Sequence, residues 1–340
     1  MKAEPRVPAP SPKRRGGENP SSSPLRFGEG LPSPTVSIVM AAKNYARFLP
    51  AAVESVLAQT FAGWELVVVD DGSTDATPAA VKPFLSDPRI HYHRSDRLGQ
   101  SRAKNLGIRL SRGQFVAFLD ADDAWHPTKL AKQLPLFYKP TVGVVYCRRS
   151  LIDEAGNGLP PRPRTPLPRG RVLAEMFAYN FVCFSSVVVR RTVFDHVGAF
   201  DPTWDLAIDY ELWLRVAAQY GFDFVDEELV LYRTGHGNLS AKLADRVSAA
   251  EAMMTQAVER RGLAEKLPND AIAEGYASTF RTLAYSLRPS EPLTAATWYW
   301  RALRYGGNRT VAAKGLVASA LRWASGRRAA GTPENAGVNR

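Results

Sequence analysis

The sequence predicts an α/β fold with a Rossmann-like, mostly parallel central sheet, flanking helices and a C-terminal helical extension. Between residues 34 and 240, apolar runs of strand length alternate with segments of helical apolar spacing. This alternation is typical of right-handed strand–helix–strand units, whose strands lie parallel in one sheet. Two of the apolar runs are continuous and end abruptly in acidic residues, which indicates strands buried on both faces. Beyond residue 241 only the helical spacing remains.

Strands are predicted at 35–40, 64–69, 90–93 and 114–120, alternating with helices at 48–57, 75–85 and 99–110. Gly113 suits the C-terminal end of the third helix. A helix started by Pro127, strands at 142–147, 184–189 and 228–232, and a helix at 208–216 follow, with a hairpin and mobile loop at 150–171. Further helices are predicted at 243–262, 268–287, 291–305 and 309–325.

The composition sets limits on the domain organisation. With 340 residues and 45% hydrophobic content, the chain can form one large domain and an appendage. We expect this domain at 34–240, a helical region at 241–328, and disordered tails at 1–33 and 329–340, the first of which is rich in Pro, Ser and Arg. No apolar run reaches 18 residues, and the N-terminus lacks the pattern of a secretory signal, so a cytoplasmic protein is expected.

Charge and cysteine content narrow the classes of function. The net charge of +11 favours an anionic partner, such as a nucleotide, a phosphorylated lipid, a membrane surface or nucleic acid. Nucleic acid is disfavoured because the basic residues are scattered and are not interleaved with aromatic residues. Cys147 and Cys183 lie in apolar surroundings and are expected to be reduced, buried thiols, because their spacing supports no zinc site.

Three acidic residues follow the apolar run 114–119. Asp120, Asp122 and Asp123 would lie at the carboxyl end of a buried strand, where open α/β sheets bind ligands. Three neighbouring carboxylates repel one another unless a cation or hydrogen-bond donors compensate, and Mg²⁺ or Mn²⁺ suits such oxygen ligands. The alternative is that Asp123 caps the helix that starts near Pro127.

A second acidic pair follows the apolar run 64–69. Asp70 and Asp71 precede the turn-forming Gly72, so two strands end in the same way and predict one shared crevice. Capping of the next helix is again the alternative. Because the first strand is followed by neither a glycine-rich dinucleotide fingerprint nor a P-loop, we expect metal and side chains to hold any phosphates.

A third acidic residue lies in the first turn of the helix predicted at 208–216. The helix dipole stabilises the Asp209 carboxylate as an anion, as a base acting at neutral pH requires, although simple charge complementation of the helix end is the alternative. Trp204 could stack on a sugar or belong to the core. The last strand leads to Arg233 and His236.

Four blocks of this sequence resemble the large inverting glycosyltransferase family usually called family 2, whose members have the GT-A fold. They are VSIVMAAKNYARFLPAAVESVLAQTF, WELVVVDDGSTD, GQSRAKNLGIRLSRGQFVAFLDADD, and FDPTWDLAIDYELWLRVA with YRTGHGNLS after it. The blocks span residues 34–240, so the N-terminal tail and the last hundred residues lie outside the resemblance. All four in this order make the resemblance specific.

The resemblance implies roles for particular residues. Asp70 or Asp71 matches the acid that binds the donor's base, Asp120 and Asp122 match the DxD motif with its direct metal ligand second, and Asp209 matches the general base. The implied donor-binding residues are Ala42, Asn44, Asp70, Asp71, Arg102, Asn105, Asp120, Ala121 and Arg233. The implied metal ligands are Asp122 and His236, and the implied acceptor-binding residues are Trp204 and Trp213.

The implied reaction is transfer of a sugar, with inversion, from a nucleotide-diphospho-sugar to an acceptor hydroxyl. A UDP-sugar donor, a carbohydrate or glycolipid acceptor, Mn²⁺ or Mg²⁺, and a role in cell-surface glycan synthesis are expected. The sequence departs from the family pattern at Ala41–Lys43, where the aromatic residue beside the base is absent, and at Ile208, where Glu is usual.

Two alternatives differ in class from this reaction. A non-catalytic nucleotide-sugar or glycan-binding protein could use the same fold, whereas a nucleotidyltransferase would carry a glycine-rich basic loop after its first strand. The basic segment 309–325 resembles a surface helix, which would contact the inner face of the membrane or pack on the main domain.

Overall fold

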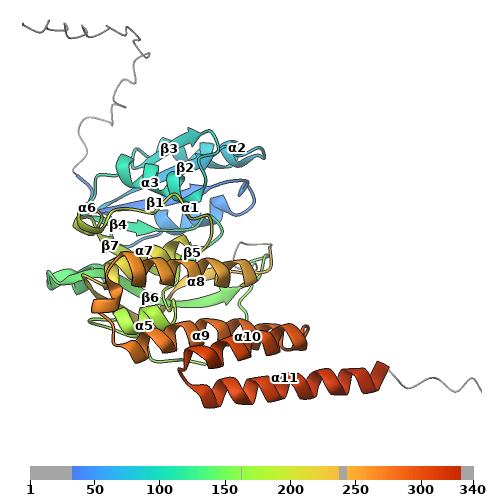
Figure 1. Ribbon diagram of the computed structural model, residues 1–340. Helices are drawn as coiled ribbons and strands as arrows, with labels where there is room; N and C mark the ends of the chain where they lie inside the picture. The colour runs from blue at the N-terminus through green and yellow to red at the C-terminus, as the bar shows by residue number, and fades with distance from the viewer. Residues whose placement is uncertain (1–32, 162, 237–242, 331–340) are drawn as a thin grey trace, which may run out of the picture. The chain divides into compact units, whose positions relative to one another are not determined.

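A computed structural model describes residues 33–161, 163–236 and 243–330, and within these ranges one mixed sheet organises the chain (Figure 1). The strand order is β3-β2-β1-β4-β7-β6-β8-β5. The α/β architecture predicted from the sequence is therefore confirmed. The predicted tails, apart from a few residues at their inner ends, and the end of the fourth resemblance block lie outside the described residues.

The first half of the sheet is parallel, as predicted. It consists of β1 (Val36–Ala42), β2 (Trp64–Asp71), β3 (Ile90–Ser95) and β4 (Phe115–Phe118), connected through α1 (Leu49–Leu57), α2 (Thr77–Val81), η1 (Lys82–Ser86) and α3 (Gln100–Leu110). In this register Ala42 lies opposite Asp70. Because parallel strands end at the same edge, the acidic ends of β2 and the β4 connection meet on one side.

The second half mixes directions. The strand β7 (Val188–Arg190) is antiparallel to β4 and to β6 (Val142–Ile152), whereas β8 (Gly221–Arg233) is parallel to β6 and carries the antiparallel β5 (Ala124–Trp125) at the edge. The predicted strand at 184–189 is wrong in its first half, because Phe184–Ser186 form a 3-10 turn, η3, before β7. The predicted loop at 150–171 starts later, since β6 continues to Ile152.

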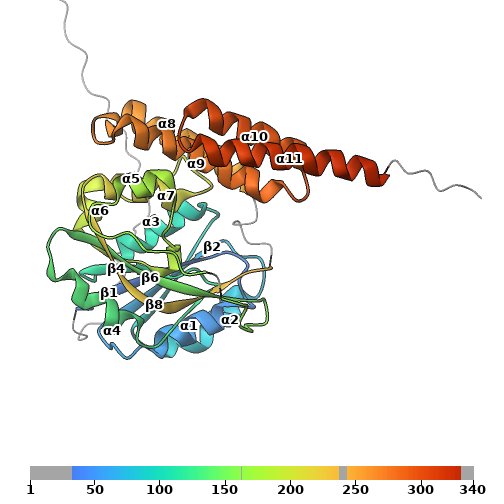
Figure 2. The same ribbon diagram turned by 90° about the horizontal axis from the view of Figure 1, so that it is seen from below.

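Helices cover both faces of the sheet (Figure 2). On one face lie α1, α2, α4 (Lys129–Gln133) and its continuation η2 (Leu134–Tyr138); on the other lie α3, α5 (Leu173–Ala178), α6 (Thr192–Val197) and α7 (Ile208–Ala217). The sequence did not predict α5 and α6. Continuous apolar runs of the strands, such as residues 66–68 in β2, are fully buried between these layers.

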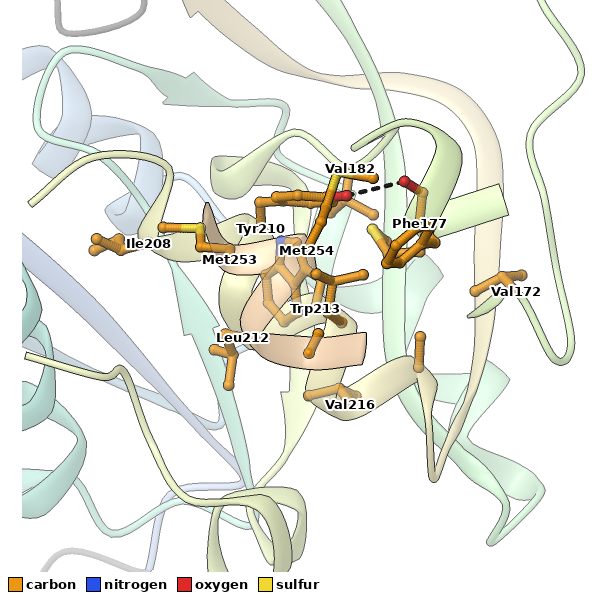
Figure 3. Close-up of a cluster of buried hydrophobic side chains, with 14 of the residues drawn as sticks. Val172, Phe177, Val182, Ile208, Tyr210, Leu212, Trp213, Val216, Met253 and Met254 are labelled. Carbon is orange, nitrogen blue, oxygen red and sulfur yellow. Dashed lines mark hydrogen bonds between the residues drawn. The ribbon is translucent and has the colours of Figure 1, made fainter. Parts of the chain in front are cut away.

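A further layer of helices covers α5 and α7. It contains α8 (Leu243–Arg260), η5 (Leu263–Glu265), α9 (Asn269–Leu287), α10 (Pro292–Tyr305) and α11 (Arg309–Ala330). Figure 3 shows Met253 and Met254 of α8 beside Trp213 of α7, in the same hydrophobic cluster. No helix within the described ranges is both long and apolar enough to cross a membrane.

Buried charges join this outer layer to α7. The buried Glu211 carboxylate accepts a hydrogen bond from Arg215 (Nη2 to Oε2, 2.7 Å) and is also paired with Arg261, which follows α8. Arg261 reaches Asp201 as well, at 3.1 Å. Because Glu211 lies two residues after Asp209, this network fixes the helix that carries the predicted base.

Candidate functional site

The carboxylates at the end of β2 close two turns. Asp70 accepts hydrogen bonds from the Ser73 N–H (2.8 Å) and the Tyr92 hydroxyl (2.5 Å). Asp71 accepts from the N–H groups of Leu98 (2.5 Å) and Gly99 (3.0 Å), which precede α3. Neither carboxylate caps α2, so the capping alternative for this pair is wrong. The pair instead shapes the loops at the sheet edge.

Asn44 joins the end of β1 to the same edge. Its backbone is left-handed, with φ of 62°, a conformation that Asn tolerates better than most residues. The Asn44 side-chain oxygen accepts the Thr74 N–H (2.8 Å), and its own N–H donates to the Ser73 hydroxyl (2.9 Å). Ala42 is buried just before it. Ala42 and Asn44 therefore lie at the sheet edge beside the turn that follows β2, and their donor-binding role stays a prediction.

Hydrogen bonds of Asp123 connect the loop after β4 to η3 and to the end of β8. Its carboxylate is 2% exposed and accepts hydrogen bonds from the Ser185 hydroxyl (2.5 Å) and the Arg233 N–H (2.9 Å). The Ser185 hydroxyl in turn accepts the Asp120 N–H (3.1 Å). The capping alternative for Asp123 is wrong, because its oxygens are bound to η3 and to the end of β8.

His236 meets Asp122 at this junction. The His236 Nε2 lies 3.0 Å from Asp122 Oδ2, and that nitrogen has no aligned hydrogen-bond partner among the described residues. The imidazole packs on the Phe48 ring, with centroids 4.8 Å apart. Adjacent ligands of an octahedral ion, each about 2.1 Å from it, lie about 3.0 Å apart, so this spacing fits a hard divalent cation.

Arg233 supports the acidic loop through backbone groups. Its Nε donates to the Asp122 carbonyl (2.8 Å), and its Nη1 donates to the carbonyls of Asp153 and Glu154 (both 3.0 Å). Arg233 is a buried residue, with 6% of its surface exposed. Arg233 therefore holds the position of the loop, which differs from the direct donor contact predicted for it.

Lys104 supplies a positive charge that the sequence analysis did not single out. Its Nζ lies 3.3 Å from Asp120 Oδ1 and over the Phe184 ring, 4.1 Å from the centroid. Ala121, between the two acids of the DxD motif, is buried. Lys104 thus compensates Asp120 and leaves Asp122 to face His236.

Burial and mutual repulsion disfavour the charged forms of two carboxyl groups in the acidic cluster. Burial, and then the negative charge of Asp120, raise the pKa of Asp122 to about 7. Burial, followed by the charges of Asp122 and Asp120, raises the pKa of Asp123 well above its ordinary value. A bound divalent cation would favour the ionised carboxylates and so lower these pKa values. No three His, Cys, Asp or Glu side chains enclose a metal position within the described ranges, so substrate oxygens would have to complete the coordination.

Asp209 lies in the first turn of α7, as predicted, and is half-buried. Asn180, which the sequence analysis missed, donates its amide N–H to Asp209 Oδ2 at 2.9 Å. Residues 180–185 therefore connect the two parts of the site, because Asn180 contacts Asp209 and Ser185 contacts Asp123.

The remaining predicted residues occupy varied positions. Arg102 is exposed on α3, whereas Asn105 exchanges two hydrogen bonds with the backbone of Phe200, at 2.8 and 2.9 Å, and so holds a turn. Trp204 is half-buried against the main hydrophobic cluster. Trp213 has no exposed surface and packs edge-to-face on Phe222, so its predicted acceptor contact is not compatible with its position in the core (Figure 3).

Comparisons with known proteins place the chain in a family. The family model described as "Glycosyl transferase family 2" matches residues 37–198. A relative from Escherichia coli, named UDP-Glc:alpha-D-GlcNAc-diphosphoundecaprenol beta-1,3-glucosyltransferase WfgD, is 38% identical over 185 residues, which are 53% of this chain and 69% of that protein. Glycosyltransferases from Rickettsia species align over 27% to 70% of their own length.

Two solved structures share the fold. S. aureus TarS 1-349 in complex with UDP-GlcNAc has a TM-score of 0.57 at 16% identity, over 88% of this chain and 93% of that one. The mannosyltransferase PcManGT from Pyrobaculum calidifontis, in complex with GDP-Man and Mn²⁺, has a TM-score of 0.54 at 20% identity, over 85% and 87%. Together with the mixed sheet, this likeness confirms the expected GT-A fold.

Replacing Ser185 tests the junction at Asp123. In Ser185→Ala, a buried carboxylate and the Asp120 N–H each lose a partner, so the free energy of unfolding should fall by about 1–3 kcal/mol. Ser86→Ala removes an exposed hydroxyl far from the site and should change it by less than about 0.5 kcal/mol. Urea denaturation of both variants measures the difference. Equal stability of the two variants would contradict the proposed importance of this junction.

Proposed function

This chain belongs to glycosyl transferase family 2, and on that premise we propose that it transfers a sugar from a nucleotide-diphospho-sugar to a hydroxyl of a carbohydrate or glycolipid acceptor, with inversion. The observation that carries the proposal is the junction of Asp120, Asp122 and Asp123 with His236, which is 113 residues beyond Asp123. A buried acidic cluster beside an imidazole at the carboxyl edge of a sheet suits a metal–diphosphate complex.

The donor would lie along the edge formed by the ends of β1, β2 and β4. Asp70 and Asp71 shape the loops where the nucleobase would bind, and Asn44 fixes the neighbouring backbone. Asp122 and His236 would hold Mn²⁺ or Mg²⁺, which, when bound, neutralises the leaving diphosphate. A UDP-sugar is favoured because the E. coli relative is named for UDP-Glc and the TarS structure contains UDP-GlcNAc. The GDP-Man and Mn²⁺ of the mannosyltransferase structure support metal use.

Asp209 would act as the general base. Asn180 donates to Oδ2, so that oxygen is oriented, while Oδ1 receives no hydrogen bond from the described residues. The proton of the acceptor hydroxyl would move to Oδ1 as the hydroxyl oxygen attacks the anomeric carbon from the side opposite the diphosphate. The bond from that carbon to the diphosphate oxygen breaks, and the configuration inverts. Asn180 takes the orienting part that Glu would play at position 208 in the usual family pattern.

Replacing the base separates chemistry from binding. Asp209→Asn keeps the shape of the residue but removes the proton acceptor, so UDP release from the preferred UDP-sugar and its acceptor should fall about 10²–10⁴-fold. The Kd for UDP with Mn²⁺ should stay unchanged, because this base contacts the acceptor side. Asp195→Asn, which changes an exposed carboxylate on α6, should leave both quantities at their original values.

Near-normal turnover in Asp209→Asn would contradict the assignment of the base. If the unaltered protein bound UDP with Mn²⁺ but turned over no sugar nucleotide with any acceptor, the non-catalytic alternative would replace the proposed reaction.

The C-terminal helices suggest how a glycolipid acceptor would be reached. Exposed apolar side chains on α10 and α11 include Leu293, Trp300 and Leu321, which are 53%, 54% and 66% exposed. Arginines accompany them, and the Arg304 guanidinium lies 5.1 Å from the Trp300 ring centroid. Apolar side chains among basic residues suit the interface of an anionic membrane, so we extend the proposal to peripheral contact with such a surface.

Vesicle sedimentation tests this contact. The protein should pellet with vesicles of phosphatidylglycerol and phosphatidylcholine but remain in solution with phosphatidylcholine alone, since each basic residue contributes about 1 kcal/mol near an anionic surface. The double variant Trp300→Ala, Leu321→Ser should bind less. Tyr138→Ala, which removes a 70% exposed side chain from η2, serves as the control. Equal pelleting of all three proteins, or equal binding to both vesicle types, would contradict the membrane contact.

A further inference from the structure

Arg149 lies at an irregular point of β6. The register between β6 and β8 shifts between Cys147 and Arg148 and again between Arg148 and Arg149. Such irregularities re-aim side chains and are frequent beside active sites. Arg148 pairs with Asp226 and donates to the Thr165 carbonyl at 3.0 Å. Its neighbour Arg149 instead lies over the Tyr232 ring, 4.6 Å from the centroid, with the Cys183 thiol beside it.

The Arg149 guanidinium has no acidic partner. Within the described ranges, no carboxylate lies at ion-pair distance from it, whereas Arg148, Arg215 and Arg261 are each paired with at least one. Arg149 is exposed as a residue, so solvent reaches part of it. An aromatic ring fixes a guanidinium without neutralising it. Arg149 is therefore a positioned cation for which the proposed reaction has so far given no role.

Its surroundings belong to the site. The charges of Arg149, Asp123 and Asp120 act on the pKa of the Cys183 thiol. Cys183 lies two residues before Ser185. Tyr179 also lies near this guanidinium, and the residue after it, Asn180, contacts Asp209. Arg149 thus lies near Tyr179 and Cys183, which stand on either side of Asn180 in the chain that runs from the Asp209 contact to the Asp123 contact.

Arg233, the arginine expected to bind a donor phosphate, already donates hydrogen bonds within the protein. Arg233 donates to three backbone carbonyls and supports the loop. Lys104 faces Asp120. Arg149 offers a planar fork of N–H donors, which matches the oxygens of a phosphate group better than a lysine does.

We propose that the Arg149 guanidinium binds a phosphate group of a ligand during transfer. This inference rests on the proposed function and names a subsite within it. The phosphate could come from the donor diphosphate or from a phosphate on the acceptor. Tyr179, which is 59% exposed beside the cation, suits stacking on a sugar joined to that phosphate.

Two binding measurements on the full chain distinguish the sources. The first is calorimetric binding of UDP with Mn²⁺, which reports on the donor diphosphate. The second is binding of decyl diphosphate to protein saturated with UDP and Mn²⁺, which reports on an acceptor phosphate. Arg149→Gln should weaken at least one of them roughly 10- to 100-fold, since charge-assisted hydrogen bonds are lost. Arg149→Lys should recover part of that loss.

The control is Arg148→Gln, which removes the same charge from the same strand but from a side chain that faces Asp226. It should leave both affinities unchanged, and thermal unfolding should show that every variant is folded. Weakening of UDP binding alone assigns the subsite to the donor, and weakening of decyl diphosphate binding alone assigns it to the acceptor.

Unchanged affinities in Arg149→Gln, with the unaltered protein binding UDP, would overturn the inference and leave the proposed function intact. If the unaltered protein bound neither ligand, the proposed function would fail, and the phosphate subsite with it.

Discussion

The site depends on the buried carboxylate of Asp123. Its two hydrogen bonds, from Ser185 and from the Arg233 N–H, hold η3 and the end of β8 against the loop that follows β4. A buried carboxylate is costly unless such donors satisfy it, so these segments cannot separate cheaply. The same contacts place Asp122 beside His236, where burial and then the charge of Asp120 raise the pKa of Asp122 to about 7. One structural requirement therefore creates the position that a divalent cation would occupy.

The proposed base is held by a different set of contacts. Asp209, Arg233 and His236 all lie beyond residues 37–198, which the family model matches. The helix that carries Asp209 is fixed by Asn180, by the buried pairing of Glu211 with Arg261, and by the packing of α8 on Trp213. The outer helices thus stabilise α7, the helix of the proposed base, as well as presenting the exposed surface of α10 and α11.

Much of the fold could be predicted, because continuous apolar runs such as 64–69 specify buried parallel strands and their acidic ends mark the ligand edge. The prediction for 184–189 is wrong in its first half because the Ser185 hydroxyl bonds the buried Asp123 carboxylate, which holds residues 184–186 in a turn. Local pattern cannot reveal Lys104 or Asn180, since their partners Asp120 and Asp209 are distant in sequence. The acceptor role predicted for Trp213 does not fit its burial, because sequence pattern does not show which tryptophan lies in the core.

The most direct test of this account is UDP binding by calorimetry, with Mn²⁺ and with a chelator, to the unaltered protein and to Asp122→Asn. If Asp122 and His236 form a metal–diphosphate site, the unaltered protein binds UDP in a metal-dependent way, and the variant loses most of that affinity. The affinity that remains should not respond to Mn²⁺. UDP binding that is the same with chelator, and the same in the variant, would contradict the central claim that this acidic junction is built to hold a cation and a diphosphate.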